Sequence, residues 1–116
     1  MNQKVSDISF LKTFTSGKTE MMKMFINTFF KSAETSMAEM KEHLANKNYA
    51  ELKKAAHSLK PQLSYMGINS LAPMIQDIEQ NAADGNDEEK IKLQVEQVIA
   101  VTLQAIEELK EELQKL

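Results

Sequence analysis

The sequence predicts an all-α protein: an antiparallel up-down-up-down four-helix bundle with a short additional N-terminal helix laid over one end. Apolar residues recur at steps of three and four along most of the 116 residues. Only three glycines and two prolines are present, so few positions interrupt a helix. The polar turns between the periodic stretches are short, which places consecutive helices side by side in opposite directions.

The composition is that of one domain spanning residues 1–116. A chain of this length can bury a modest core without help from cross-links. It has no cysteine, which excludes disulfides and thiolate zinc sites, and its eight methionines fill a core with flexible side chains. No stretch has the length of a signal peptide's apolar segment or of a membrane span, so we expect a soluble, cytoplasmic protein.

The charge balance excludes a nucleic-acid partner. The net charge is −3, the isoelectric point is near 5.4, and arginine, the usual reader of phosphate and guanine, is absent. The same acidic, lysine-only composition gives no reason for membrane contact. We expect a monomer.

The first element is a short helix from about residue 7 to residue 14. Ser6 or Asp7 is a suitable cap, and Ile8, Leu11 and Phe14 fall on one side. Thr15, Ser16 and Gly17 then break the pattern.

A long amphipathic helix follows over residues 18–45. Phe25, Phe29 and Phe30 make its first half aromatic, and we interpret them as core residues. His43, near the end, is interpreted as a surface residue close to the negative end of the helix dipole. The apolar stripe consists of Met22, Phe25, Phe29, Ala33, Met37, Met40 and Leu44.

The next helix covers residues 48–66 and begins with a capping-box pattern, Asn48 with Glu51. Pro61 lies inside it, where its ring crowds the carbonyl of His57 and no N–H is available to bond to that carbonyl. Two interpretations stay open: Pro61 kinks the helix beside His57, or it marks an earlier helix end. The apolar stripe consists of Leu52, Ala55, Ala56, Leu59, Leu63 and Met66.

Two more helices complete the bundle, over residues 70–83 and 88–115. Gly67 closes the preceding helix, Asn69 or Ser70 can cap the first of the two, and Pro73 falls in its first turn. A polar turn, residues 84–87, leads into the last helix. Their apolar residues are Leu71, Met74, Ile75, Ile78 and Ala82, then Ile91, Val95, Val98, Thr102, Ala105, Leu109 and Leu113.

His57 is the residue on which the functional prediction depends. At about 100° per residue it lies about 150° around its helix from the centre of the apolar stripe, so it faces water. Lys60 sits one turn further on, within reach of anything attached to the imidazole. An exposed imidazole flanked by lysines suits an added anion better than a metal, although an ordinary surface histidine has the same position.

The run His57-Ser58-Leu59-Lys60, with Gly67 ten residues after the histidine and Leu71 beyond it, resembles the active helix of histidine-containing phosphotransfer (HPt) domains. The order of helices resembles theirs from about Phe10 to the C-terminus. One departure is Pro61, which stands where the family usually has a small residue, most often glycine.

The resemblance implies roles for several residues. His57 is expected to carry the phosphoryl group and Lys60 to stabilise it. Glu79, 22 residues after the histidine, stands where the family commonly has Gln or Glu, and is expected to orient the imidazole. Asp77 and Gln76 are less favoured substitutes for Glu79. Access and helix geometry at the active helix are expected to depend on Pro61, Gln62, Ser64 and Gly67, with Ser58 among the small polar neighbours.

The implied partners are response-regulator receiver domains and a hybrid histidine kinase. An imidazole can accept a phosphoryl group and pass it to a carboxylate, so the chain is expected to be a phosphocarrier without autonomous kinase activity. No cofactor is expected on this chain, because it has no glycine-rich phosphate loop, and magnesium is expected on the receiver. The two histidines, fourteen residues apart, lack metal-ligand spacing, so no metal site is expected.

Two alternatives remain beside the phosphorelay. Pro61 favours a binding module that docks receivers or kinases without accepting phosphate. A purely structural helical domain would be indicated by a buried His57. Tyr65 is interpreted either as part of a docking rim or, preferably, as a partly buried structural residue.

Overall fold

The computed structural model describes residues 4–85 and 87–116, and these residues are helical over most of their length. Asn86, within the polar turn expected at residues 84–87, lies outside the described residues. The five helices are α1 (Ser9–Phe14), α2 (Thr19–Ala45), α3 (Tyr49–Tyr65), α4 (Ala72–Asp84) and α5 (Glu88–Lys115).

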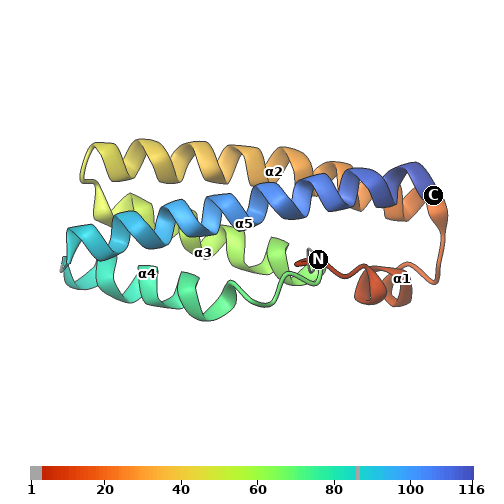
Figure 1. Ribbon diagram of the computed structural model, residues 1–116, viewed down its shortest axis with the longest axis horizontal. Coiled ribbons are helices and arrows are strands. Elements are labelled where there is room, and N and C mark those ends of the chain that lie inside the picture. The colour runs from red at the N-terminus through yellow and green to blue at the C-terminus, as the bar shows by residue number, and fades with distance from the viewer. Residues whose placement is uncertain (1–3, 86) are drawn as a thin grey trace.

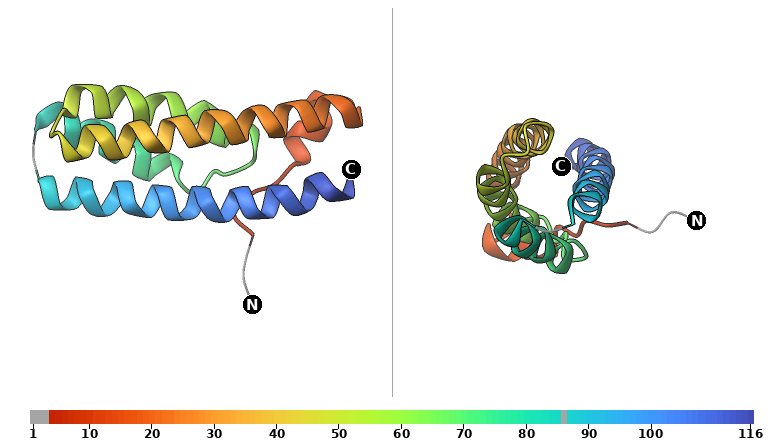
Figure 2. Two further views of the ribbon diagram at one scale, coloured as in Figure 1. Left: turned by 90° about the horizontal axis from the view of Figure 1, so that it is seen from above. Right: turned by 90° about the vertical axis from the view of Figure 1, so that its left-hand side faces the viewer.

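Helices α2 to α5 form an antiparallel four-helix bundle, as the sequence predicts. Within the bundle, α3 packs against α2 and α4, α4 packs against α5, and α5 closes the ring by packing against α2. The end-on view in Figure 2 shows this ring, and Figure 1 shows the alternating directions. With 27 and 28 residues, α2 and α5 are much longer than α3 and α4, and α1 lies near the end that the shorter helices leave uncovered (Figure 1).

The predicted apolar stripes form one core. All six stripe residues of α3 are buried, and so are those of α5 except Leu113. Thr102 is fully buried and donates its hydroxyl to the carbonyl oxygen of Val98, 2.7 Å away, which satisfies its only polar side-chain atom. Three of the predicted core residues are only partly buried, although they pack against the core: Phe25, Phe30 and Met74. Ile26, outside the predicted stripe, is fully buried.

Side chains cap two of the helices. Asn48 Oδ1 accepts a hydrogen bond from the backbone N–H of Glu51, which fixes the start of α3. The return bond of a capping box is replaced by an ion pair between Glu51 and Lys54. At the start of α5, Asp87 Oδ1 accepts from the backbone N–H of Lys90.

Two helices begin two residues later than their approximate predicted starts. Helix α1 begins at Ser9, not at residue 7, because Asp7 Oδ1 accepts bonds from both the N–H and the hydroxyl of Ser9 and so holds the chain in a turn before the helix. Helix α4 begins at Ala72, with Leu71 at its N-cap and no side-chain cap from Asn69 or Ser70. Leu71 is buried, at 2% exposed.

An N-terminal strap, residues 4–7, joins parts of the chain that are far apart in sequence. The carboxylate of Glu108 accepts hydrogen bonds from the N–H groups of Val5 and Ser6 and from the Ser6 hydroxyl, at 2.6 to 3.1 Å. The N–H of Asp7 donates to the carbonyl oxygen of Met66, and Lys4 pairs with Glu112. The strap therefore connects α5 with the end of α3 and leads directly into α1.

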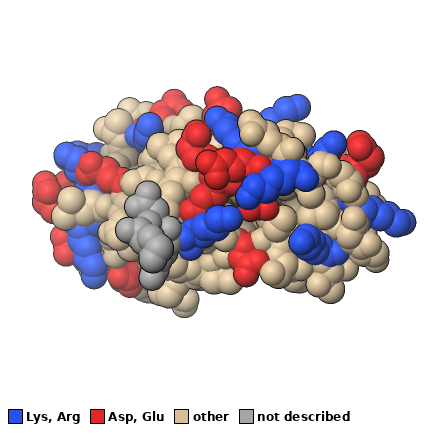
Figure 3. All heavy atoms as spheres, turned by 45° about the vertical axis from the view of Figure 1, so that its right-hand side comes forward, with Lys and Arg blue, Asp and Glu red and all other residues tan. Residues whose placement is uncertain are grey.

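Opposite charges are interleaved on one face of the molecule. Figure 3 shows lysine side chains lying between acidic ones on this face. Lys4 and Lys115 both pair with Glu112, at 3.0 and 3.8 Å. Among the described residues, no helix has both the length and the apolar character needed to cross a bilayer.

Candidate functional site

His57 projects outward from the middle of α3. The buried side chains of Leu52, Ala56 and Leu59 hold one face of the helix against the core, so the opposite face must point to solvent. The side chain of His57 is 74% exposed, as the helical period predicts. A purely structural domain, which a buried His57 would have indicated, is therefore not favoured.

Glu79 on α4 contacts the imidazole of His57. Nδ1 of His57 and Oε1 of Glu79 are 2.6 Å apart, and the Glu79 side chain is only 14% exposed. Since an ionised carboxylate only accepts hydrogen bonds, Nδ1 carries a proton, and this N–H donates a hydrogen bond to Glu79. In the neutral form of the ring, this leaves Nε2 as the nitrogen that presents a lone pair to solvent.

The other two residues considered for this role lie elsewhere. Asp77 turns toward α5, where it accepts a hydrogen bond from Gln94 at 3.0 Å and pairs with Lys90 at 3.6 Å. The bond from Gln94, followed by the charge of Lys90, holds the pKa of Asp77 below its ordinary value. Gln76 is exposed on α4. Glu79 is thus the acid that the packing of α3 against α4 brings to His57.

Three lysines of α3 surround His57. Lys60, one turn after the histidine, is half-buried and, within the described residues, makes no ion pair. Lys54 is held by Glu51, with 3.2 Å between Nζ and Oε1. Lys53, one turn before the histidine, is exposed. The imidazole therefore lies among lysines of its own helix, with the carboxylate of Glu79 against Nδ1.

An open hollow lies beside the imidazole at the junction of α3 and α4. His57 and Glu79 form part of its wall. Helix α4 contributes, besides Glu79, only the short side chains of Ala82 and Ala83 to this wall. The other lining residues are Ala50, Lys53, Lys54 and Ser58.

Pro61 does not end the active helix. Helix α3 continues four residues beyond it, to Tyr65, so the interpretation of an earlier helix end is wrong. Burial of Leu63 and Met66 on the core side explains why the helix continues despite the missing N–H of Pro61. The expected kink beside His57 stays a prediction.

The remaining predicted site residues differ in their surroundings. Gln62 is partly buried, and its Nε2 donates to the carbonyl oxygen of Ser58, so it lies along the helix instead of reaching outward. Ser64 is exposed and donates weakly to the Lys60 carbonyl oxygen at 3.4 Å. Gly67 follows the helix end with φ of 69°, a left-handed conformation that favours glycine.

A cluster of half-exposed aromatic rings lies next to this site, and the sequence interpretation missed it. Phe10, Phe14 and Tyr65 are 51%, 54% and 48% exposed, and their ring centroids are 5.8 to 6.2 Å apart. In the sequence pattern Phe14 falls on the same side of its helix as Leu11, but Phe14 is exposed whereas Leu11 is buried. The spacing of four residues between Phe10 and Phe14, which places both on one face of a helix, was the available signal.

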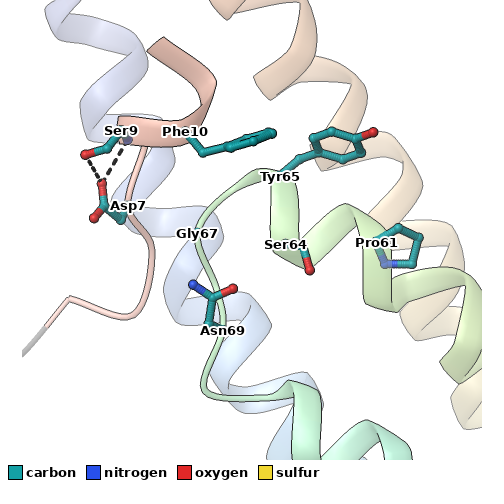
Figure 4. Close-up of a pocket in the computed structure, with 8 residues that line it drawn as sticks. All are labelled: Asp7, Ser9, Phe10, Pro61, Ser64, Tyr65, Gly67 and Asn69. Atoms are coloured by element: carbon teal, nitrogen blue, oxygen red, sulfur yellow. Dashed lines mark hydrogen bonds between the residues drawn. The ribbon is translucent and has the colours of Figure 1, made fainter. Parts of the chain in front are cut away.

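The aromatic cluster borders a second hollow at the end of α3. Figure 4 shows the Phe10 ring facing Tyr65, with Ser64 and Pro61 further along the same helix. His57, Pro61 and Ser64 follow one another at steps of four and three residues, so they form one exposed ridge. The ridge leads from the imidazole to the aromatic cluster.

This arrangement is suited to nucleophilic chemistry at Nε2. A neutral imidazole with one nitrogen held by a carboxylate is a good nucleophile at its other nitrogen. Nearby ammonium groups can neutralise the oxygens of a phosphoryl group attached there. The site can therefore carry a phosphoryl group.

Comparison with known proteins gives one match. Neither the curated proteins nor the solved structures that were searched contain a significant match to this chain. The family model described as the Hpt domain matches residues 24–116, which include α3, α4, α5 and most of α2. With four-fifths of its length matched and a helical bundle as its fold, the chain belongs to the Hpt domain family, whose role is histidine phosphotransfer in two-component phosphorelays.

Proposed function

We propose that this protein is a phosphorelay intermediate, which accepts a phosphoryl group on His57 from the aspartyl phosphate of one receiver domain and donates it to the aspartate of another. The observation that carries the proposal is the contact between Nδ1 of His57 and Oε1 of Glu79. This contact leaves Nε2 as the nucleophile on a side chain that is 74% exposed.

Each transfer is a single displacement at phosphorus. The lone pair of Nε2 attacks phosphorus while the bond from phosphorus to the aspartate oxygen breaks, and the bonding electrons return to the aspartate carboxylate. The ring becomes positively charged, and Glu79 stabilises that charge through the proton on Nδ1. Reversal of the same step places the phosphoryl group on the next receiver.

Lys60 is assigned to the phosphoryl oxygens. It follows His57 by three residues on the same helix, and no described carboxylate occupies its ammonium group. A charge-assisted hydrogen bond to the phosphoryl group would replace water around both charges. We expect Lys60→Gln to slow transfer about threefold to tenfold, because a partly exposed bond of this kind contributes about 1 kcal/mol.

The partners supply the remaining chemistry in this proposal. The receiver contributes the aspartate and its magnesium ion, and a hybrid histidine kinase starts the relay. The chain acts as a monomeric, cytoplasmic phosphocarrier without kinase activity of its own. The exposed ridge of His57, Pro61 and Ser64 gives the receiver its path to the imidazole.

The proposal is tested by incubating the protein with a panel of receivers carrying labelled aspartyl phosphate. The expected result is rapid transfer of acid-labile, base-stable label from at least one receiver, and its loss in His57→Gln. His43→Gln, which changes the other histidine, is the matched control and should accept label normally. Label that persists in His57→Gln contradicts the proposal.

The same experiment distinguishes the phosphocarrier from a second candidate function, which is suggested by Pro61. A non-phosphorylated binding module would bind unphosphorylated receivers in a titration but take no label from them. Helix α3 runs through Pro61 and leaves His57 exposed, which favours the phosphocarrier.

A further inference from the structure

Lys53 stands out among the lysines near His57, although it lies outside the run that resembles the HPt motif. By the helical period, Lys53 and Lys60 lie about 40° and 60° to one side of His57, and Lys54 lies about 60° to the other side. The residues of α3 that border the hollow, Lys53 among them, extend about 40° to the side of Lys53 but about 100° to the side of Lys54, as far as Ser58. The hollow and α4 therefore lie mainly toward the side of Lys54 and Ser58.

The contact with Glu79 orients the ring relative to these lysines. Nδ1 of His57 is turned toward α4, where Glu79 lies 2.6 Å away. The two ring nitrogens point in divergent directions, so Nε2 is turned away from α4. That is the side of α3 on which Lys53 and Lys60 lie.

Lys53 is also within reach along the helix axis. Lys53 and His57 are four residues apart and are therefore neighbours on one face of α3, and the long side chain of Lys53 can turn toward the imidazole, which leans toward the N-terminus of the helix. Consistent with this, Lys53 and His57 line the same hollow. Lys60 reaches the imidazole from the following turn, so the two lysines approach Nε2 from opposite ends.

The two lysines before His57 differ in whether their charge is already engaged. The ammonium group of Lys54 is paired with Glu51 at 3.2 Å. Lys53, among the described residues, has no carboxylate partner and no hydrogen bond. An exposed, unpaired ammonium group can turn toward a new anion without breaking an existing contact.

We propose that Lys53 is a second cation for the phosphoryl group on His57, acting together with Lys60. A phosphoryl group carries a charge of about −1.5 to −2 near pH 7 and has three acceptor oxygens. A single ammonium group, with one positive charge, cannot neutralise it. This inference rests on the proposed function, because it needs a phosphoryl group on Nε2. It adds a residue that the resemblance does not supply.

The test uses chemical phosphorylation of the full chain by phosphoramidate, which needs no receiver. Nε2 attacks phosphorus, the phosphorus–nitrogen bond of the reagent breaks, and ammonia leaves with a proton. The pH midpoint of the phosphoryl titration is then followed by phosphorus-31 NMR, with His57→Gln and His43→Gln to assign the two histidine signals. A nearby cation favours the dianion and so lowers this midpoint.

Lys53→Gln should raise the midpoint of the phosphoryl titration by about 0.2 to 0.7 pH units, since an exposed ion pair contributes about 0.2 to 1 kcal/mol. Lys53→Arg, which keeps the charge, should leave it near that of the parent protein. Lys54→Gln is the matched control: it removes the same charge from the next position, and its midpoint should stay unchanged.

Three outcomes would overturn the inference: an unchanged midpoint in Lys53→Gln, an equal rise in Lys53→Gln and Lys54→Gln, or a His57 that takes no phosphoryl group from phosphoramidate. An equal rise would show only the general field of the lysines. Failure of the proposed function appears separately, as a protein that is phosphorylated by phosphoramidate but not by any receiver.

Discussion

Glu79 on α4 accepts a hydrogen bond from Nδ1 of His57 on α3, and the two atoms are 2.6 Å apart. A residue on one helix thus fixes the ring on the next, so the orientation of the nucleophile depends on how α3 packs against α4. The side chain of Glu79 is mostly buried while that of His57 is mostly exposed, which makes Glu79 the rigid member of the pair.

Removal of the Glu79 carboxylate should slow phosphorylation of His57. We expect Glu79→Ala to reduce the rate of transfer from a receiver about tenfold to a hundredfold, because the ring loses both its orientation and the partner for its positive charge. Glu79→Gln should have a smaller effect, since its amide oxygen still accepts from Nδ1.

Single-turnover transfer measured with a labelled receiver checks this prediction. Asp77→Asn is the matched control, because Asp77 lies on the same helix but contacts Gln94 and Lys90. A Glu79→Ala protein that reacts at the parent rate would show that the contact does not matter for transfer.

Substitution of Pro61 should stabilise the protein. Pro61 lies inside α3 and cannot donate to the carbonyl oxygen of His57, so Pro61→Ala should raise the free energy of unfolding by about 1 to 3 kcal/mol. Pro61→Gly should gain about 1 kcal/mol less, because glycine is a poorer helix former than alanine.

Urea unfolding followed by circular dichroism measures both variants. Pro73→Ala, in the first turn of α4, should change the free energy of unfolding by less than about 1 kcal/mol, because no intrahelical bond is missing there. A Pro61→Ala protein no more stable than the parent would contradict the prediction, because Pro61 would then not lower the free energy of unfolding.

Gly67 should not tolerate a side chain. Its φ is 69°, and a Cβ atom would overlap the backbone oxygen of Asp7, so either Gly67 or the strap must move. We expect Gly67→Ala to lower the free energy of unfolding by about 2 to 4 kcal/mol, combining the left-handed backbone with the steric overlap.

Gly17→Ala separates the cost of the left-handed backbone from the cost of the steric overlap. Gly17 has φ of 72° but nothing within 4 Å of the added Cβ, so its substitution should cost only about 1 kcal/mol for the backbone conformation. Equal losses in the two variants, measured by urea unfolding, would mean that contact with Asp7 contributes nothing.

The strap should make stability depend on pH through Glu108. Partial burial tends to raise the pKa of Glu108, but hydrogen bonds from the Ser6 hydroxyl and from the N–H groups of Val5 and Ser6 outweigh it and hold the pKa below its ordinary value. Because the folded pKa is lowered, this stabilisation is present above the unfolded pKa of about 4.3 and is lost as the pH falls through the folded pKa.

Glu108→Gln should therefore be less stable than the parent at pH 7, by about 1 to 2 kcal/mol, with the difference shrinking below about pH 4. Thermal unfolding at several pH values provides the measurement. Glu107→Gln, which changes an exposed acid on the same turn, is the control and should show little difference at any pH. A constant difference between Glu108→Gln and the parent would rule out the titration of Glu108 as its cause.

The sequence was sufficient for features that depend on helical periodicity. The four long helices, the buried stripe of α3 and the outward direction of His57 all follow from one repeat of 3.6 residues. The place of Glu79 opposite His57 came from the resemblance, because the register between two helices depends on packing that no single-helix pattern contains.

Features that depend on contacts between distant segments could not be predicted. Phe14 is exposed although it shares a periodic pattern with Leu11, because α1 is too short for its period to define a buried face. The bonds from Ser6 to Glu108 join residues 102 positions apart, and neither residue is unusual in its local sequence. The aromatic cluster likewise required α1 and the end of α3 to be placed together.

The strap also has a consequence for the order in which the chain folds. Contacts between residues about a hundred positions apart carry a high loop-closure cost, so the bonds of Val5 and Ser6 to Glu108 should form after the bundle has assembled. Interactions that are absent from the transition state affect the unfolding rate and leave the folding rate almost unchanged. We therefore expect residues 4–7 to slow unfolding of the bundle while leaving its folding rate almost unchanged.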